Sequence, residues 1–268
     1  MPVLACADAL RAGDARVELV TACDESEIDT TIKAVEASGA RLVVAAASDA
    51  ELRAVVRRLV RRHAPPPSKR PTALPPGRTM FDLPPLAVLP LLPSLPALVA
   101  RLDLPRTAAD VAAATLAGRE RRLDLLRTDS GSVTLHAALL GGIDPDQGLA
   151  PWRGRVEVDD AVLTDGDEAV LACAVQNLGS SDVDGLPLVT DADPADGRIE
   201  VAVAVPVLKR RLVRAAAVSY EIRRARGRSV SVIPRDVDIR HVDDGVVSAL
   251  GRKRAWWIEA GAWGTYVM

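Results

Sequence analysis

The polar side chains best placed for chemistry follow the first continuous apolar run of the chain. Ser48 and Asp49 come directly after RLVVAAA, residues 41–47, and before a helical pattern. Open α/β sheets bind ligands at the carboxyl ends of their strands, so Asp49 is placed to contact a ligand hydroxyl or a cation. Aspartate is also a favoured helix N-cap, worth about 1 kcal/mol, and capping is the competing interpretation.

Two more candidates stand among apolar residues. Asp124 follows Leu123 and precedes two leucines, where a carboxylate is costly unless it is hydrogen-bonded. If Asp124 has only a structural role, we expect it to form an ion pair with Arg121 or Arg122. His136 lies in the middle of an expected strand, VTLHAAL, where a histidine with a backbone partner is commoner than a catalytic base.

An acidic loop is the candidate metal site. Asp193 and Asp196 follow Asp191 closely and precede Gly197. Carboxylate oxygens at this spacing can hold Mg²⁺ or Ca²⁺, although short acidic loops are more often simple turns. The three histidines and three cysteines form no zinc-binding pattern.

The composition describes a globular protein without a general affinity for nucleic acid. Of 268 residues, 49% are hydrophobic and 26% are charged, with a formal net charge of −2. Almost all basic residues are arginine, as expected from a high-GC coding bias. Cys6, Cys23 and Cys173 show no CxxC spacing, which predicts free thiols in a reducing compartment and a cytoplasmic location. The longest uncharged stretch, residues 83–100, carries five prolines, which argues against a membrane helix.

The first third of the chain alternates strand and helix patterns, which predicts a doubly wound α/β layer. We expect strands at residues 16–22 and 41–47, each followed by a helix, at residues 24–39 and 51–62. A proline-rich segment follows, with an irregular loop at 64–78. It is succeeded by a short strand at residues 86–89 and by a helix from the N-cap Thr107 to Gly118.

After residue 120 the period changes to that of strands, and we expect a mainly antiparallel β-sandwich domain. One helix is expected there, at residues 208–216. The predicted domains are therefore residues 1–120 and 121–268, with the carboxyl-terminal tail, rich in tryptophan, packing back on the first domain. The predicted strands are residues 133–139, 155–162, 169–176, 198–205, 229–233 and 237–242.

Several stretches, in the right order, resemble the catalytic domain of bacterial diacylglycerol kinases and related lipid kinases. They match the family's strand and helix around its GGDGT loop, its GTxND loop with the helix after it, its segment ending in Leu-Asp, and its strand ending in Asn with the Asp-Gly stretch that follows. In this chain they are residues 42–59, 86–105, 112–126, and 170–177 with 186–205. The resemblance implies a two-domain kinase fold with a ligand cleft between the domains.

The nucleotide motifs of that family are degenerate here. GGDGT becomes residues 47–51, in which only Asp49 matches; the added Cβ atoms close the approach to phosphate, and Glu51 adds a negative charge. GTxND becomes residues 93–97, in which Ser94 stands for the threonine while two prolines remove backbone donors. The family's Asp-Gly-Glu becomes Asp244-Gly245-Val246, and its first strand, ending in Asn-Pro, has no counterpart before residue 16.

The resemblance therefore implies a lipid-kinase-like protein that has lost ATP-dependent phosphoryl transfer and binds a small or lipid-like ligand in the interdomain cleft. One alternative is an enzyme of changed chemistry in specialised metabolism, and another is an active kinase acting on a diacylglycerol-like hydroxyl. No cofactor is expected for the first two possibilities. ATP and Mg²⁺ are expected only if the protein is an active kinase. The ligand-binding candidates are Ser48, Asp49, Ser94, Asp124, His136 and Asn177.

The missing first strand also bears on association. A nucleotide layer without it exposes a sheet edge, and such edges are usually covered or paired. Residues 2–12 are apolar enough to form a short strand that folds back onto this edge. A second copy related by a two-fold axis is the other way to cover it, and we favour a homodimer. The alternative is a compact monomer whose proline-rich segment, residues 83–95, lies across the gap.

Overall fold

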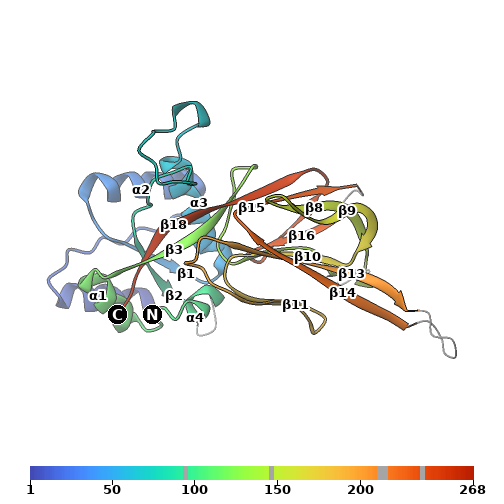
Figure 1. The fold of residues 1–268 in the computed structure, drawn as a ribbon. Coiled ribbons are helices and arrows are strands. Elements are labelled where there is room, and N and C mark those ends of the chain that lie inside the picture. Colours follow the sequence, from blue (N-terminus) through green and yellow to red (C-terminus); the bar gives the residue numbers. More distant parts are fainter. Residues whose placement is uncertain (93–95, 145–147, 210–216, 236–238) are drawn as a thin grey trace. The chain divides into compact units, whose positions relative to one another are not determined.

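The computed structural model describes residues 1–92, 96–144, 148–209, 217–235 and 239–268. The chain divides into two compact units, Met1–Asp124 with Glu259–Met268 and Leu125–Ile258 (Figure 1). No helix in the described part of the chain is long and apolar enough to cross a membrane. Cys6, Cys23 and Cys173 are free thiols.

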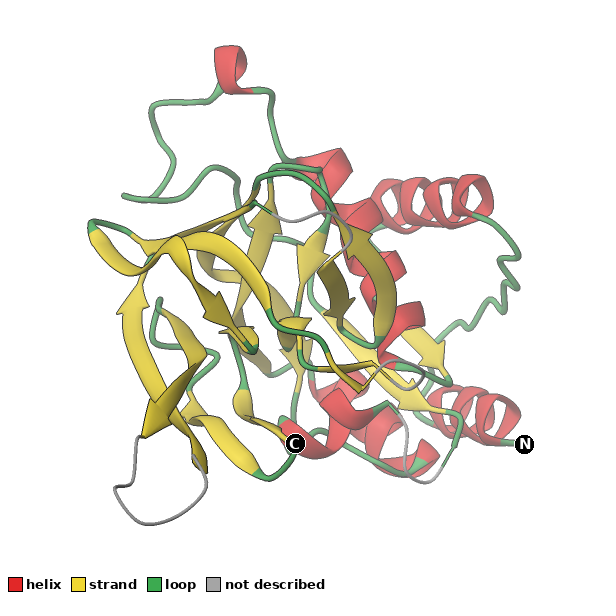
Figure 2. Ribbon diagram, turned by 90° about the vertical axis from the view of Figure 1, so that its right-hand side faces the viewer, coloured by secondary structure: helices red, strands yellow, loops and turns green. Residues whose placement is uncertain are grey.

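The amino-terminal unit contains all the helices that the structure describes, drawn in red in Figure 2. Its helices are α1 (Pro2–Ala12), α2 (Glu25–Ser38), α3 (Asp49–His63), the 3₁₀ turn η1 (Pro67–Lys69), α4 (Ala97–Arg101) and α5 (Ala108–Ala117). Its strands are β1 (Leu42–Ala46) and β2 (Leu86–Pro90), with parts of β3 (Glu120–Thr128) and β18 (Arg254–Tyr266).

Local hydrogen bonds explain where the longer helices begin and end. The side chains of Asp24, Ser48 and Thr107 accept hydrogen bonds from backbone N–H groups three residues ahead, at the starts of α2, α3 and α5. Gly39 and Gly118 end α2 and α5 in the left-handed conformation, at φ of 65° and 70°. These three predicted helices are confirmed.

Strands β1, β2 and β18 run parallel where they pair. Leu42–Ala46 pairs in register with Leu86–Pro90, and Thr265 at the end of β18 pairs with Leu86. One face of β2 packs, through Ala87 and Leu89, on an apolar cluster supplied mainly by α1 and α5. This packing removes the face of the sheet from water and stabilises the unit.

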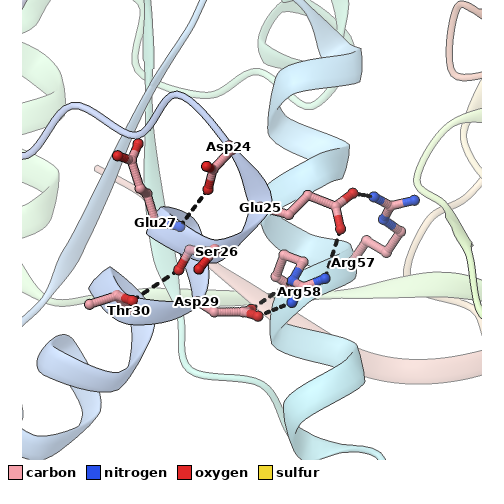
Figure 3. A network of polar contacts seen from close by, with 8 residues as sticks. All are labelled: Asp24, Glu25, Ser26, Glu27, Asp29, Thr30, Arg57 and Arg58. Carbon is pink, nitrogen blue, oxygen red and sulfur yellow. Dashed lines mark hydrogen bonds and ion pairs between the residues drawn. The ribbon is translucent and has the colours of Figure 1, made fainter.

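Helix α2 is attached to α3 by ion pairs rather than by a wide apolar face (Figure 3). Glu25 pairs with Arg57 and Arg58, and Asp29 also pairs with Arg58. Near the other end of α2, Glu36 accepts from Arg62 and His63. Burial alone raises the pKa of Glu36, but the hydrogen bonds from these two side chains outweigh it and the pKa is lowered.

Two expectations for the start of the chain are wrong. Residues 2–12 form a helix and not a strand, and this helix packs on α5 and β2. Residues 16–22 form no strand; they are irregular, and Leu19 and Val20 are 50% and 54% exposed. A strand needs a neighbour for its backbone groups, and no described strand pairs with this segment.

The carboxyl-terminal unit consists of strands joined by tight turns. They are the remainder of β3 and β18 together with β4 (Val133–Thr134), β5 (Ala137–Gly141), β6 (Ile143–Asp144), β7 (Gly148–Leu149), β8 (Trp152–Val158), β9 (Ala161–Val170), β10 (Ala172–Gln176), β11 (Gly179–Val183), β12 (Leu186–Ala192), β13 (Ile199–Lys209), β14 (Ala217–Gly227), β15 (Ser229–Pro234), β16 (Ile239–Asp243) and β17 (Val246–Leu250). The strand pairings described within this unit are antiparallel. The predicted fold class, α/β followed by mainly antiparallel β, is confirmed.

Strand β10 explains how this unit is layered. Cys173 and Val175 belong to a large apolar core that strands of both larger sheets contribute to. Ala172 and Ala174, on the opposite side of the strand, belong to a second core under the hairpin β11–β12. Because both faces are covered, β10 is apolar along its length, and burial raises the pKa of the Cys173 thiol to about 12.

Several details of the predicted strands are wrong. The run 155–162 is broken by a turn at Asp159, whose φ is 47°, so it belongs to two strands of a hairpin. The run 133–139 is interrupted between β4 and β5. Of the helix predicted at 208–216, the first two residues lie in β13, and 210–216 lie outside the described residues.

Candidate functional site

The loop after β1 is closed by its own side chains. The Ser48 hydroxyl caps α3 by accepting a hydrogen bond from the Glu51 N–H at 3.3 Å. The Glu51 carboxylate in turn accepts a hydrogen bond of 2.7 Å from the Ala47 N–H. A helix N-terminus of this kind attracts anions, and here the anion is a carboxylate of the same loop.

The capping role suggested for Asp49 is wrong, because Ser48 occupies the cap position of α3. Its carboxylate instead accepts a hydrogen bond of 3.0 Å from the Leu98 N–H, at the start of α4. Burial raises the pKa of Asp49, although hydrogen bonds from Leu98 and Ala97 and the charge of Arg101 oppose this shift. Asp49 therefore joins the loops that follow β1 and β2.

A pocket of about 390 Å³ opens at the carboxyl end of β2. Its walls are mainly apolar, and Arg106 and Thr107 contribute the polar groups. Ser94 lies outside the described residues, so its position relative to the pocket stays a prediction. The lining residues are Pro2, Pro90, Leu91, Leu92, Pro96, Val99, Ala100, Arg106, Thr107 and Ala108.

Asp124 is 1% exposed and is bonded to the last strand. Its carboxylate accepts a hydrogen bond of 2.6 Å from the Gly261 N–H, and its carbonyl accepts one of 3.0 Å from the Trp263 indole. The arginines expected as its partners donate to backbone carbonyls of the same unit, Arg121 to Leu102 and Arg122 to Leu83. These contacts join β3 to β18.

Asp244 is a buried residue of the Asp-Gly pair that predicts a turn between two strands. It lies in the turn between β16 and β17, with φ of 47°. Its carboxylate accepts backbone hydrogen bonds from Leu135, His136 and Ala137, at 2.7, 2.8 and 3.2 Å. The Asp-Gly pair, typical of a tight turn, was the signal that could have identified this role.

The contacts of Asp244 position His136 between β4 and β5. The Nε2 atom of His136 lies 3.2 Å from the Gln176 side-chain nitrogen, which also donates to the Leu178 carbonyl at 2.6 Å. Because the amide donates to both groups, this His136 nitrogen is the acceptor. Asn177 is fully buried beside them and donates to the Leu135 carbonyl at 2.8 Å. The structure thus brings His136 and Asn177 together in one polar cluster.

The acidic loop makes the contacts of a turn. Asp193 accepts from the Ala195 N–H at 3.0 Å, and Asp196 accepts from the Arg198 N–H at 2.8 Å. Asp196 also forms an ion pair with Arg226. Among the residues that the structure describes, no three or more His, Cys, Asp or Glu side chains are grouped to hold a metal ion. A metal at Asp193 and Asp196 stays a prediction.

The candidates therefore fall into separate groups. Ser48 and Asp49 lie together in the amino-terminal unit, close in sequence to the carboxylate of Glu51. His136 and Asn177 lie together in the carboxyl-terminal unit. Glu51 and Gln176 were not among the predicted site residues, although the Ser-x-x-Glu spacing of a capping box pointed to Glu51.

Three solved structures can be compared with this chain over almost its whole length. A diacylglycerol kinase from Bacillus anthracis str. Sterne aligns with a TM-score of 0.68 and 14% identity over 97% of this chain and 88% of its own. A second structure, a putative diacylglycerol kinase from the same strain, aligns with a TM-score of 0.70 and 13% identity over 100% of this chain and 91% of its own. The chain has the diacylglycerol kinase fold. An NAD kinase from Archaeoglobus fulgidus, solved in complex with ATP, aligns with a TM-score of 0.53 and 11% identity over 98% of this chain and 88% of its own.

No family model and no curated protein matches the sequence. At identities of this size, the likeness extends to the fold alone. The fold implied by the resemblance is therefore confirmed, whereas the activity has to be argued from the loops described above.

The first prediction concerns Asp49, compared as Asp49→Asn and Asp49→Ala by urea denaturation at several pH values. The alanine variant should lose about 1 kcal/mol, because α4 loses its capping acceptor. The asparagine variant keeps an acceptor without a charge. A raised folded-state pKa means that Asp49 contributes less to stability as pH rises through that pKa. The free energy of unfolding of the asparagine variant, relative to that of wild type, should therefore increase between acidic and neutral pH. A relative loss over that interval would contradict this account.

A second prediction concerns Asp244. Replacement by alanine leaves three backbone N–H groups without their acceptor and should cost roughly 3 kcal/mol or more in the free energy of unfolding. Asp244→Asn should lose less, since asparagine tolerates positive φ and keeps one acceptor oxygen. Asp193→Ala, at a loop carboxylate, is the matched control and should stay near wild type. Equal losses in the two alanine variants would show that Asp244 has no special role.

Proposed function

We propose that this protein is a diacylglycerol-kinase-like binding protein that no longer transfers phosphate from ATP. The observation that carries the proposal is the hydrogen bond of 2.7 Å between the Glu51 carboxylate and the Ala47 N–H. This donor lies at the carboxyl end of a parallel strand, where the fold places its ligands. A phosphate there has to displace Glu51 and then lie beside a carboxylate, so the loop does not fit a triphosphate.

The second loop supports the same proposal. The backbone donors at the start of α4 are bonded to Asp49 and are therefore not free for a nucleotide. Proline at position 96 supplies no N–H at all. In the carboxyl-terminal unit, Val246 stands where the family has the glutamate of Asp-Gly-Glu. Val246 is 40% exposed and carries no group that can take a proton.

The pocket at the end of β2 supports a ligand that is largely apolar. Proline, leucine and valine side chains make up most of its wall, and an alkyl chain gains free energy when it leaves water for such a surface. The guanidinium of Arg106, at the same pocket, suits an anionic group on that ligand. An amphipathic molecule with a short acyl chain and one acidic group is the class that we propose. A cytoplasmic location, which the free cysteines favour, is part of this proposal.

Calorimetry with MgATP tests the loss of nucleotide binding. Wild type should give no binding heat at millimolar MgATP. A variant with the four changes Ala47→Gly, Ser48→Gly, Ala50→Gly and Glu51→Thr reopens the loop and should bind measurably, because the Ala47 donor and its neighbours are then available. Neither protein should label a dispersed diacylglycerol from γ-labelled ATP. Micromolar affinity of wild type for MgATP, or labelling of the lipid, would establish the kinase alternative instead.

A fluorescent fatty acid, dansyl-undecanoic acid, tests the apolar pocket. The probe should bind wild type with a blue-shifted emission, and Ala100→Trp should weaken binding at least tenfold because the indole fills the pocket. Arg101→Trp is the matched control, since Arg101 is exposed and does not line the pocket. Equal affinity in the two tryptophan variants would place the ligand elsewhere. Loss of binding in Arg106→Gln but not in Arg106→Lys would identify the acidic group's partner as a positive charge.

A further inference from the structure

Strand β1 is a sheet edge with the composition of a central strand. Its residues, LVVAA, include no charge, proline or bulge, the features that usually protect an edge. Within the described residues it pairs only with β2. Ala45 is exposed, so the middle of the open side is accessible.

The backbone groups on that open side can be identified. The Ala46 carbonyl accepts a hydrogen bond of 3.0 Å from the Leu91 N–H, directly after β2, so Ala46 faces β2. In a parallel ladder successive residues face opposite neighbours. The N–H and C=O groups of Val43 and Ala45 therefore face the open edge. The next donor on this side, the Ala47 N–H, is bonded to Glu51.

The same chain holds a strand-like segment whose backbone pairs with no described strand, although its Val17 side chain packs on the apolar cluster around β2. Residues 16–22, RVELVTA, are rich in the residue types that strands prefer, yet they are irregular. No backbone hydrogen bond joins them to another described segment. They form the connection between α1 and α2, drawn in blue in Figure 1, with Leu19 and Val20 exposed. An edge and a strand thus stand unpaired in one chain.

Pairing within one chain is disfavoured by charge. Residues 16–22 reach β1 through one helix, α2, and such a crossover gives a parallel pair. A parallel pair brings Arg16 toward Arg41 and Asp24 toward Asp49. An antiparallel pair instead brings Arg16 toward the acidic end of the edge, next to Asp49 and Glu51. Residues 16–22 of a second copy can adopt this antiparallel orientation, because no crossover helix connects them to the edge with which they pair.

We propose that residues 16–22 of one copy pair, antiparallel, with the open edge of β1 in a second copy. The exchange is reciprocal, so a single two-fold dimer satisfies both edges and both segments. Helix α2 keeps its ion pairs with α3 in each copy, because only the connection before Asp24 changes its partner. Backbone pairing supplies the affinity, and Leu19 and Val20 lose their exposure to water.

Light scattering at micromolar concentration tests the dimer. Wild type should have twice the chain mass of 28.4 kDa. Ala45→Pro removes a donor from the open edge, where proline is tolerated, and should be a folded monomer. Val20→Pro lies in a segment without backbone bonds and should give the same result. Ala45→Val and Val20→Ala are the controls and should remain dimers. A monomeric wild type, or a folded proline variant that is still dimeric, overturns the proposal.

Crosslinking tests which segments meet. One tagged chain carries Leu19→Cys and a differently tagged chain carries Ala45→Cys, both with Cys23→Ser to remove the exposed native thiol. After mixing, a short bismaleimide should join the two different tags. A product that joins two Ala45→Cys chains, or a bridge within a chain that carries both changes, overturns the exchange. Neither experiment depends on ATP or on the pocket, so it can fail while the proposed function holds.

Discussion

Backbone donors directly after β1 and at the start of α4 are bonded to carboxylates of the same chain, and the amino-terminal unit depends on this arrangement. Glu51 accepts from the Ala47 N–H, and Asp49 accepts from the Leu98 N–H. Such donors are costly to leave unpaired once they are partly buried, so the carboxylates stabilise both loops. The same bonds occupy groups that an external anion needs. Stability of the loops and affinity for phosphate are therefore opposed at this position.

The carboxyl-terminal unit contains a carboxylate with a similar role. Asp244 accepts three backbone hydrogen bonds and thereby holds the interruption between β4 and β5. His136 and Asn177 are positioned by this interruption and by the end of β10. The valine after the Asp-Gly turn is 40% exposed. In each unit, a carboxylate is hydrogen-bonded to backbone N–H groups of the same chain.

Features that depend on short-range interactions were predictable. Asp24 and Thr107 cap the helices that follow them because an N-cap needs only a side-chain oxygen and an N–H three residues ahead. The buried strands β1 and β2 were recognisable as continuous apolar runs between turn residues. Residues 16–22 have a strand-like composition but form no strand, since a strand forms only if another segment supplies its hydrogen-bond partners. The composition of that segment says nothing about such a neighbour.

The sequence by itself determined the fold class, the positions of α2, α3 and α5 and the absence of glycine at residues 47–51. Tertiary structure decided what the remaining polar groups do. Asp49 bonds to a residue 49 positions away and Asp124 to one 137 positions away, so neither partner could be found from local spacing. The physical reason is that a buried carboxylate binds whichever donor the packing brings within 3 Å or so. Periodicity along one segment predicts the shape of that segment, whereas the choice of donor belongs to the assembled chain.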